Sequence, residues 1–290
     1  MNGILIVDKP AGWTSNDAVA KLRGVLHERR IGHGGTLDPM ATGVLPVFVG
    51  RATRAAEFCE GFEKEYFAGI RLGLVTDTQD ITGTVINSAE KIEVSRAELS
   101  RALAGFRGSM MQTPPMYSAV KVGGRKLYEL ARRGVEIERS ARPITVSLLE
   151  IADNPDERDD FLLHVVCTKG TYVRTLIHDI GQTLGCGAAM SSLRRTRAGD
   201  FSEIDAIRLE ELIKAAAAGD AEKFLLPTDT LFKKHPEFTV SAENEKKCRN
   251  GAPFNAAVRD GNYRVYGIDG EFLMLGKCSD GLMITVKSFF

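Results

Sequence analysis

The 290-residue sequence lacks long apolar runs, paired cysteines and an excess of charge of either sign. No apolar run approaches the ~20 residues of a membrane span, and Met1–Asp8 has neither a basic region nor a cleavage site. The five cysteines form no Cys-x-x-Cys pair and no even-numbered framework of the secreted type. These absences predict a cytoplasmic protein without a membrane span, whose cysteines are buried thiols.

Charge is balanced at 38 basic and 38 acidic residues, which excludes the global basic field that drives indiscriminate binding to nucleic acid. Any RNA site must therefore be local. Basic residues gather at Arg29 and Arg30, within residues 121–133, and within residues 194–197. Each group alone could equally be an ordinary solvent-exposed surface. The three groups together favour an anionic partner.

Glycine is concentrated in Arg30–Gly43, where we expect neither helix nor strand. The segment carries one imidazole, His33, and one carboxylate, Asp38, which Pro39 biases toward an extended or turn conformation. By itself, an Asp-Pro pair in a glycine-rich loop most often forms a turn in which the carboxylate bonds to its own backbone. Because His33 and Asp38 lack a metal-ligand spacing, we expect no metal site.

The run Gly-His-Gly-Gly-Thr-Leu-Asp-Pro-Met-Ala-Thr-Gly-Val-Leu-Pro at 32–46 resembles the catalytic motif of the TruB family of bacterial tRNA pseudouridine-55 synthases. In that motif Asp38 takes the position of the nucleophilic aspartate. Asp8-Lys9-Pro10 resembles the family's first motif, in which the lysine supports the site structurally. The resemblance runs in order from Lys9 to Arg195 through separated motifs, which makes it highly specific.

Residues 65–73 alternate in the manner of a strand and place Tyr66 on one face with three aliphatic residues. An aromatic residue on such a face belongs more often to the core than to a site. However, Lys64 to Tyr66 resembles the family motif that carries the active-site tyrosine. Asp80 matches a family position near the site, although a turn residue bonded to its own backbone is the simpler interpretation.

Residues 112–142 combine prolines, paired glycines, tyrosines and basic residues. This composition suits an RNA clamp, because cations hold phosphate and aromatic rings stack on bases. The alternative is an ordinary helical hairpin, since residues 126–133 favour a helix. The stretch resembles the thumb insertion of the family, which closes on the T-loop of tRNA. The basic residues expected to contact RNA are Lys121, Arg125, Lys126, Arg132 and Arg133.

A strand is expected at residues 161–167, and Lys169–Thr175 then turns the chain into a helix. Arg174 falls in the first turn of that helix, where a cation is unfavourable unless an anion compensates it. A surface arginine is the plain alternative, but Lys-Gly-Thr-Tyr-x-Arg resembles the family motif whose arginine pairs with the catalytic aspartate. Ser192–Thr196 resembles the last catalytic-domain motif, in which Leu193 lines the uracil pocket.

The resemblance implies an α+β fold, with a mixed, mainly antiparallel sheet. It places a pseudouridine synthase catalytic domain at residues 1–230, including the thumb-like insertion at about 112–142. After it, residues 237–290 offer short strand runs separated by Asp-Gly pairs, which suggest a small β-barrel. The resemblance implies a PUA-like RNA-binding domain there, but its seven basic and seven acidic residues show no RNA-binding surface by charge alone.

Isomerising uridine to pseudouridine breaks a glycosidic bond and rejoins the same ring through carbon, so the resemblance implies an isomerase that needs no cofactor. Asp38 could add to the uracil ring, trap the sugar or remove a sugar proton, and the sequence leaves these routes open. In this interpretation Arg174 keeps Asp38 ionised, and Tyr66 stacks on the uracil and relays a proton. His33 fills the space left by the flipped base.

The implied substrate is uridine 55 in the T-arm of tRNA, bound by a monomer that needs no protein partner and no membrane. Two other classes stay open. A guide-RNA-dependent pseudouridine synthase subunit shares these motifs, but usually carries basic extensions that this sequence lacks. A tRNA-folding chaperone would use the same surfaces without chemistry.

Overall fold

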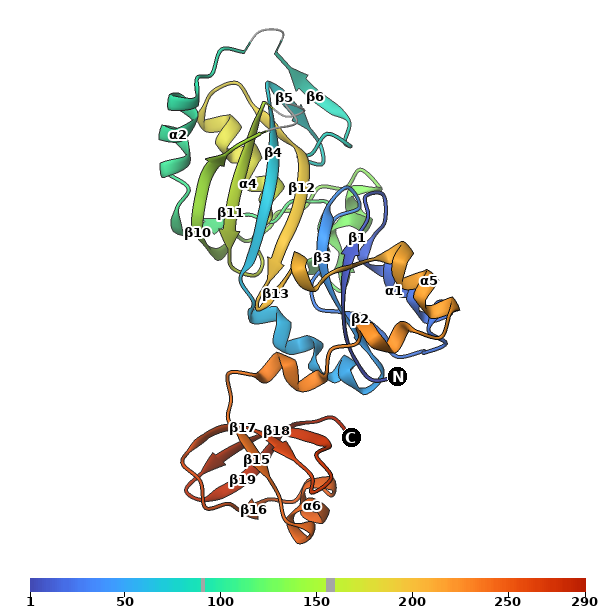
Figure 1. Cartoon of the computed structure of the whole chain (residues 1–290). Coiled ribbons are helices and arrows are strands. Elements are labelled where there is room, and N and C mark those ends of the chain that lie inside the picture. The colour runs from blue at the N-terminus through green and yellow to red at the C-terminus, as the bar shows by residue number, and fades with distance from the viewer. Residues whose placement is uncertain (90–91, 155–159) are drawn as a thin grey trace.

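A computed structural model describes residues 1–89, 92–154 and 160–290, and it shows a large mixed sheet with a smaller sheet at the C-terminal end (Figure 1). Across the large sheet, the strands follow the order β14 (Ile207–Arg208), β1 (Gly3–Lys9), β3 (Thr42–Val49), β12 (Ala188–Ala198), β4 (Lys64–Leu72), β11 (Phe161–Cys167), β10 (Arg142–Ala152) and β7 (Gly108–Gln112). Two short strands add to it, β2 (Ile31–His33) beside β3 and β13 (Phe201–Ser202) beside β12.

Neighbouring strands of the large sheet run antiparallel, apart from the parallel pairs β1 with β14 and β12 with β3. The predicted α+β fold with a mixed, mainly antiparallel sheet is therefore confirmed. The glycine-rich segment differs from expectation, because β2 occupies its start and β3 begins at Thr42. β2 forms its backbone hydrogen bonds with β3, a partner that the local sequence does not reveal.

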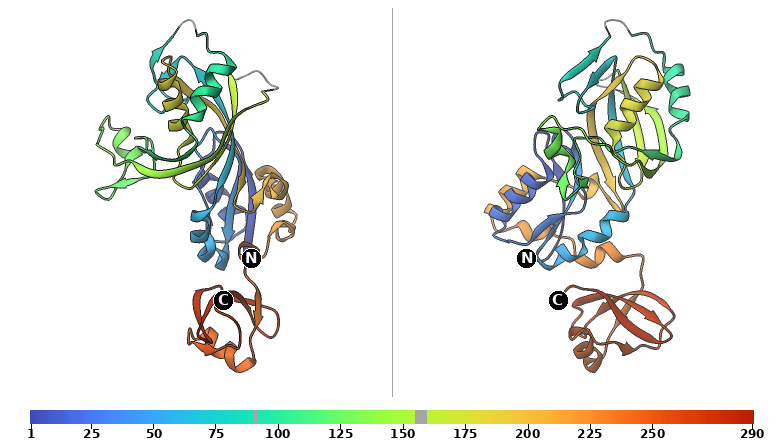
Figure 2. Two further views of the ribbon diagram at one scale, coloured as in Figure 1. Left: turned by 90° about the vertical axis from the view of Figure 1, so that its left-hand side faces the viewer. Right: turned by 180° about the vertical axis from the view of Figure 1, so that it is seen from behind.

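Helices cover the large sheet unevenly. α2 (Arg96–Ala104) and α4 (Val173–Thr183) lie on the same face, as the right-hand view of Figure 2 shows. α1 (Ser15–Val25) and α5 (Leu209–Ala217) pack against each other beside β1. In α4 the apolar residues Val173, Leu176, Ile177 and Ile180 recur at helical spacing and are all buried. Their burial fixes which side of α4 faces the sheet.

The remaining elements are hairpins and short helices. Two are hairpins, formed by β5 (Leu74–Thr76) with β6 (Val85–Ser88) and by β8 (Lys121–Val122) with β9 (Arg125–Lys126). The short helices are α3 (Leu127–Ala131) and the 3-10 helices η1 (Gly50–Gly61), η2 (Glu203–Asp205), η3 (Ala221–Phe224) and η4 (Thr228–Phe232). Among the described residues, none of the helices combines the length and apolar character required to cross a bilayer.

The C-terminal part forms a curled sheet, confirming the expected small β-rich domain. Its strands follow the order β15 (Glu237–Thr239), β17 (Gly261–Tyr266), β18 (Phe272–Ser279), β19 (Leu282–Ser288) and β16 (Phe254–Asn255). α6 (Ala242–Arg249) is a helix that local patterns do not predict, because only Cys248 in it is buried and its sequence shows almost no apolar periodicity. Ion pairs four residues apart, such as Lys247 with Glu243 at 2.7 Å, support this helix instead.

An aromatic cluster joins the small sheet to the rest of the chain. Phe232 of η4 contacts Phe58 of η1, with ring centroids 5.0 Å apart, and Phe289 near the C-terminus, at 5.7 Å. Phe289 in turn stacks on Phe272 of β18, at 5.2 Å. Because the two parts share this apolar core, the small sheet is held against η1 rather than tethered only by its linker.

Candidate active site

One row of residues crosses four adjacent strands at the centre of the large sheet. Lys9 of β1 pairs with Gly43 of β3. Gly43 pairs in turn with Arg195 of β12, and Arg195 pairs with Tyr66 of β4. The two cations are buried, Lys9 at 0% and Arg195 at 1% exposure. A buried cation requires hydrogen-bond acceptors, and both find them in the loop Gly34–Ala41.

The loop Gly34–Ala41, which carries Asp38, is held on both sides of that residue. Arg195 donates to two loop carbonyl oxygens that precede Asp38, at 3.0 and 3.4 Å. Lys9 Nζ donates to the carbonyl oxygen of Pro39, directly after it, at 3.3 Å. The backbone around Asp38 is therefore tied to the sheet from both directions, which limits how far the carboxylate can move.

Glycine at position 43 makes this row possible. Gly43 has a φ of +100°, which side chains other than glycine rarely adopt. A Cβ there would lie 2.2 Å from the carbonyl oxygen of Arg195. The strand that carries Arg195 can approach β3 only because this Cβ is missing.

Arg174, in the first turn of α4, supplies the cation that faces Asp38. Its Nη2 lies 3.6 Å from Asp38 Oδ1, and its Nη1 lies 3.8 Å from Asp80 Oδ2. The Arg174 and Asp80 side chains are 6% and 5% exposed, whereas Asp38 keeps 31% of its side-chain surface open. The Gln112 side-chain amide bonds the Tyr172 backbone at 2.8 and 3.1 Å and so fixes where α4 begins. The predicted compensating anion for Arg174 is thus present.

Asp80 is both a turn residue and a neighbour of the site. Its Oδ1 accepts hydrogen bonds from the Thr82 backbone N–H and the Thr78 hydroxyl, each at 2.9 Å. Its Oδ2 faces Arg174. The two interpretations offered by the sequence are therefore compatible, because the two carboxylate oxygens have different partners.

Burial decides the proton affinities of the site. Burial raises the pKa of the Asp38 carboxyl above its ordinary value; Arg174 lowers this pKa but does not outweigh the burial, and the charge of Asp80 raises it further. Burial also lowers the pKa of Lys9 to about 8. For Tyr66, burial raises the pKa of the hydroxyl, an effect that Arg195 opposes. Tyr66 therefore stays a neutral hydroxyl at pH 7, able to donate a hydrogen bond.

Leu193, predicted to line the uracil pocket, and His33, predicted to fill the space left by the flipped base, lie respectively on β12, a strand of this row, and on β2, which pairs with β3. Leu193 is two residues before Arg195 on the same side of β12 and is 8% exposed. His33 ends β2, and its Nδ1 is buried without a hydrogen-bond partner among the described residues. Burial lowers the pKa of His33, which keeps the imidazole neutral. These properties suit apolar contact and packing better than proton transfer.

The five basic residues of the predicted clamp lie on the β8–β9 hairpin and around α3, which project from the large sheet (Figure 2, left). Lys126 and Arg132 both lie over the ring of Tyr128, at 5.5 and 5.4 Å from its centroid. At the base of this insertion, Arg174 donates to the backbone carbonyl oxygen of Tyr117. The insertion is thus in direct contact with the residue that faces Asp38.

Two family models match this chain. The model described as "TruB family pseudouridylate synthase (N terminal domain)" matches residues 23–173, which is more than half of the chain. The chain belongs to the TruB family. A second model, "tRNA pseudouridylate synthase B C-terminal domain", matches residues 174–233. These matches confirm the family and the isomerase class expected from the sequence motifs.

Individual relatives extend the match. The "tRNA pseudouridine synthase B" of Clostridium kluyveri is 41% identical over 298 aligned residues, covering 100% of both chains. That of Heliobacterium modesticaldum is 48% identical over 232 residues, covering 80% of this chain and 75% of the relative. Among solved structures, a chain of a Cbf5-Nop10-Gar1 complex is 28% identical with a TM-score of 0.74, covering 99% of this TruB-family chain and 85% of that one.

The sequence motifs did not single out Arg195, which the structure places at the centre of the row. The sequence did contain an indication of this position. Residues two apart on a strand share a face, so Arg195 was expected on the same face as Leu193, which the motif assigned to the uracil pocket. An arginine on the inward face of a central strand is unusual unless it can donate hydrogen bonds to buried acceptors. Local sequence did not reveal those acceptors, since they come from a loop some 160 residues earlier.

We expect Arg195→Met to lower kcat by about tenfold to a hundredfold with a smaller effect on KM, because the Asp38 loop loses its anchor and its geometry relaxes. The matched control is Arg194→Met on the same strand, where Arg194 points to the other face and pairs with Asp8 at 3.1 Å. Steady-state kinetics should show the kcat loss only for Arg195→Met. Equal losses in both variants would contradict an anchoring role for Arg195.

Proposed function

We propose that this TruB-family protein isomerises uridine 55 in the T-loop of tRNA to pseudouridine, with Asp38 as the nucleophile or base. The supporting observation is the Asp38–Arg174 pair, with the loop that carries Asp38 bonded by the two buried cations Lys9 and Arg195. Full-length similarity to a protein named tRNA pseudouridine synthase B supports tRNA as the substrate. The protein acts as a cytoplasmic monomer in this proposal.

The reaction breaks the bond between C1′ and N1, forms one between C1′ and C5, and moves the C5 proton to N1, so it needs neither oxidant nor reductant. Asp38 supplies the negative charge that attacks the ring or sugar, or removes a sugar proton. Arg174 holds this carboxylate in place, and Tyr66 stacks on the uracil and relays the proton. Leu193 packs against the flipped base, and His33 fills the space that the base leaves.

The test of this function is incubation of the purified protein with an unmodified tRNA transcript, followed by mapping of pseudouridine at nucleotide resolution. Conversion at position 55 by the protein alone supports the proposal. A relative of known structure belongs to an "H/ACA RNP bound to a substrate RNA", at 26% identity and a TM-score of 0.72, so a guide-dependent activity is the second candidate. Conversion only when a guide RNA is supplied would favour it, and folding of tRNA without conversion would favour a chaperone.

The domains divide the work in this proposal. Residues 1–230 perform the chemistry, with the insertion at about 112–142 clamping the T-arm. Residues 237–290 contact tRNA away from the target uridine, as a PUA-like domain. Since the small sheet shares an aromatic core with η1, its RNA contacts are better tested by surface substitutions than by deletion.

Neutralising the clamp should weaken tRNA binding and flatten its salt dependence. In a variant with Arg125, Lys126, Arg132 and Arg133 replaced by Met, each lost phosphate contact should reduce the slope of log K against log salt by about 0.7. The matched control replaces only the three arginines by Lys, which keeps the charge and should keep the slope. Binding titrations at several salt concentrations measure both. An unchanged slope in the Met variant would leave these residues as solvated surface.

A further inference from the structure

A hollow of about 420 Å³ opens beside the catalytic loop. Residues 33–36 line one side, Ala56 and Glu57 of η1 line the second, and Lys64 and Lys169 line the third. Residues 33–36 lead directly into Asp38. The hollow therefore lies beside the loop segment that carries Asp38.

Two lysines, Lys64 and Lys169, line the hollow. Lys64 is 8% exposed, and its Nζ donates to the carbonyl oxygen of Phe62 at 2.7 Å. That bond uses one of the three donors of an ammonium group. Lys169 is exposed at the rim. Within the described parts of the chain, neither lysine forms an ion pair with a carboxylate, so both retain the capacity to bind an anion.

The positive charges near Lys64 and His33 also favour an anion in the hollow. Burial lowers the pKa of the Lys64 ammonium, and the positive charges of Arg195 and Lys169 lower it further. Burial likewise lowers the pKa of His33, and the charge of Arg195 adds to that effect. The buried Nδ1 of His33 has no partner among the described residues. An anion in the hollow would relieve the repulsion among the charges of Lys64, Lys169 and Arg195, and the neutral His33 would add no charge that opposes it.

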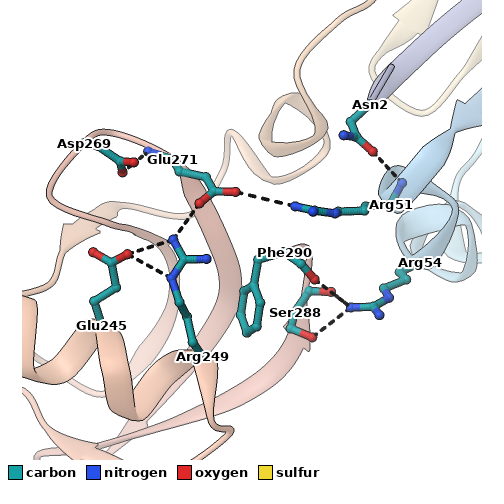
Figure 3. A network of polar contacts seen from close by, with 9 residues as sticks. All are labelled: Asn2, Arg51, Arg54, Glu245, Arg249, Asp269, Glu271, Ser288 and Phe290. Carbon is teal, nitrogen blue, oxygen red and sulfur yellow. Dashed lines mark hydrogen bonds and ion pairs between the residues drawn. The ribbon is translucent and has the colours of Figure 1, made fainter.

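The one acidic residue of the lining is already neutralised from the C-terminal domain. Glu57 pairs with Lys287 of β19 at 2.5 Å. Figure 3 shows the contacts nearer the start of the same helix, where Arg51 faces Glu271 at 3.7 Å and Arg54 donates to the carbonyl oxygen of Ser288 at 3.2 Å. The η1 wall is therefore fixed, and its carboxylate does not oppose a bound anion.

We propose that this hollow binds a phosphodiester of the RNA strand next to the target uridine, with Lys169 and Lys64 as its ligands. The inference rests on the proposed function for the identity of the RNA. A phosphodiester fits because it offers two acceptor oxygens to two ammonium groups and carries the charge that the hollow lacks. Its position follows from the chain, since residues 33–36 connect the hollow to Asp38.

The test combines one change in the RNA with one change in the protein and measures whether their effects on binding add. The RNA is a T-arm hairpin in which one phosphate at a time, on either side of the target uridine, is replaced by a neutral methylphosphonate. Binding is measured with Asp38→Asn protein so that the RNA is not converted. At one or two linkages, methylphosphonate should weaken binding about fivefold to tenfold. In the Lys169→Met protein, the same replacement should cost less than about twofold, because the contact is already gone.

Lys214→Met is the matched control, since Lys214 is an exposed lysine of α5 and lies outside the lining of the hollow. It should retain the full methylphosphonate loss. In Lys64→Met, as in Lys169→Met, the methylphosphonate should weaken binding less than it does with both lysines present. Folding of this variant is checked by thermal melting, because Lys64 is buried. The phosphate site would be overturned if, at every linkage, the methylphosphonate weakened binding equally in the protein with Lys169 and in the Lys169→Met protein. Conversion by the unmodified enzyme is measured in parallel, so failure of the subsite and failure of the proposed reaction give different results.

Discussion

Asp38→Asn is expected to abolish pseudouridine formation while RNA binding and the fold persist. The substitution keeps the side-chain shape but removes the charge, so the rate should fall by a factor on the order of 10⁴ or more. Lys9 and Arg195 bond to backbone carbonyl oxygens of the loop rather than to the carboxylate. The loop should therefore keep its position in the variant.

The same substitution should not destabilise the protein at neutral pH. Because burial raises the pKa of Asp38, the carboxyl binds its proton more tightly in the folded state than in the unfolded state. That contribution to stability is fully present below the ordinary pKa of 3.8 and is lost as the pH rises through the raised pKa. At pH 7 the ionised Asp38 therefore costs stability, and Asn removes this cost. The melting temperature should be equal or higher in the variant, and any gain should disappear at low pH.

Single-turnover assays with enzyme in excess, together with thermal melts across pH, measure these outcomes. Asp77→Asn is the matched control, because Asp77 is an exposed carboxylate that accepts from the Thr84 backbone N–H at 2.7 Å. It should retain turnover. Measurable conversion by verified Asp38→Asn protein would remove Asp38 from the chemistry, and a large drop in melting temperature at pH 7 would contradict the direction of the pKa shift.

Arg174→Met is expected to be the most damaging substitution for stability and activity together. Arg174 faces both Asp38 and Asp80, and its side chain is 6% exposed. Removal of Arg174 leaves the Asp80 carboxylate, 5% exposed, without its cation, and breaking a buried ion pair in this way costs about 3–5 kcal/mol. The Tyr117 carbonyl oxygen also loses its donor, which loosens the base of the insertion.

The pH profile separates the electrostatic role of Arg174 from a purely structural one. Arg174 lowers the pKa of Asp38, so its removal should raise that pKa further. Activity requires ionised Asp38 in our proposal, and its acid limb should therefore move to higher pH in Arg174→Met. Arg174→Lys keeps the charge without the planar guanidinium and should show a smaller shift.

The double variant Arg174→Met with Asp80→Asn provides the control for buried charge. Removing the Asp80 charge should recover part of the lost unfolding free energy, because one of the two stranded carboxylates is gone. Denaturant melts and pH–rate profiles of the single and double variants measure both effects. A destabilised Arg174→Met protein with an unshifted acid limb would contradict the pairing of Arg174 with the reactive carboxylate.

Local patterns in the sequence determined much of the fold. Strand β11 begins at Phe161 and ends at Cys167, where the sequence predicts a strand. α2 begins directly after Ser95, whose side chain forms a capping box with Glu98, a pair recognisable from its spacing in the sequence. Motif resemblance assigned Asp38, Tyr66 and Arg174 to one site. Each of these conclusions depends on residues close together in the chain, where composition and spacing carry the information.

Only the tertiary structure decided how the site is supported. Lys9, Gly43, Arg195 and Tyr66 form one row because four strands pair in a particular register. That register results from burial summed over the whole sheet, which no local pattern expresses. The pKa of Asp38 is a second case: the sequence identified Arg174 as a cation that lowers it, but the net direction depends on burial, which is larger. Burial is a property of the packed chain, and so the sequence could name the reacting groups but not their proton affinities.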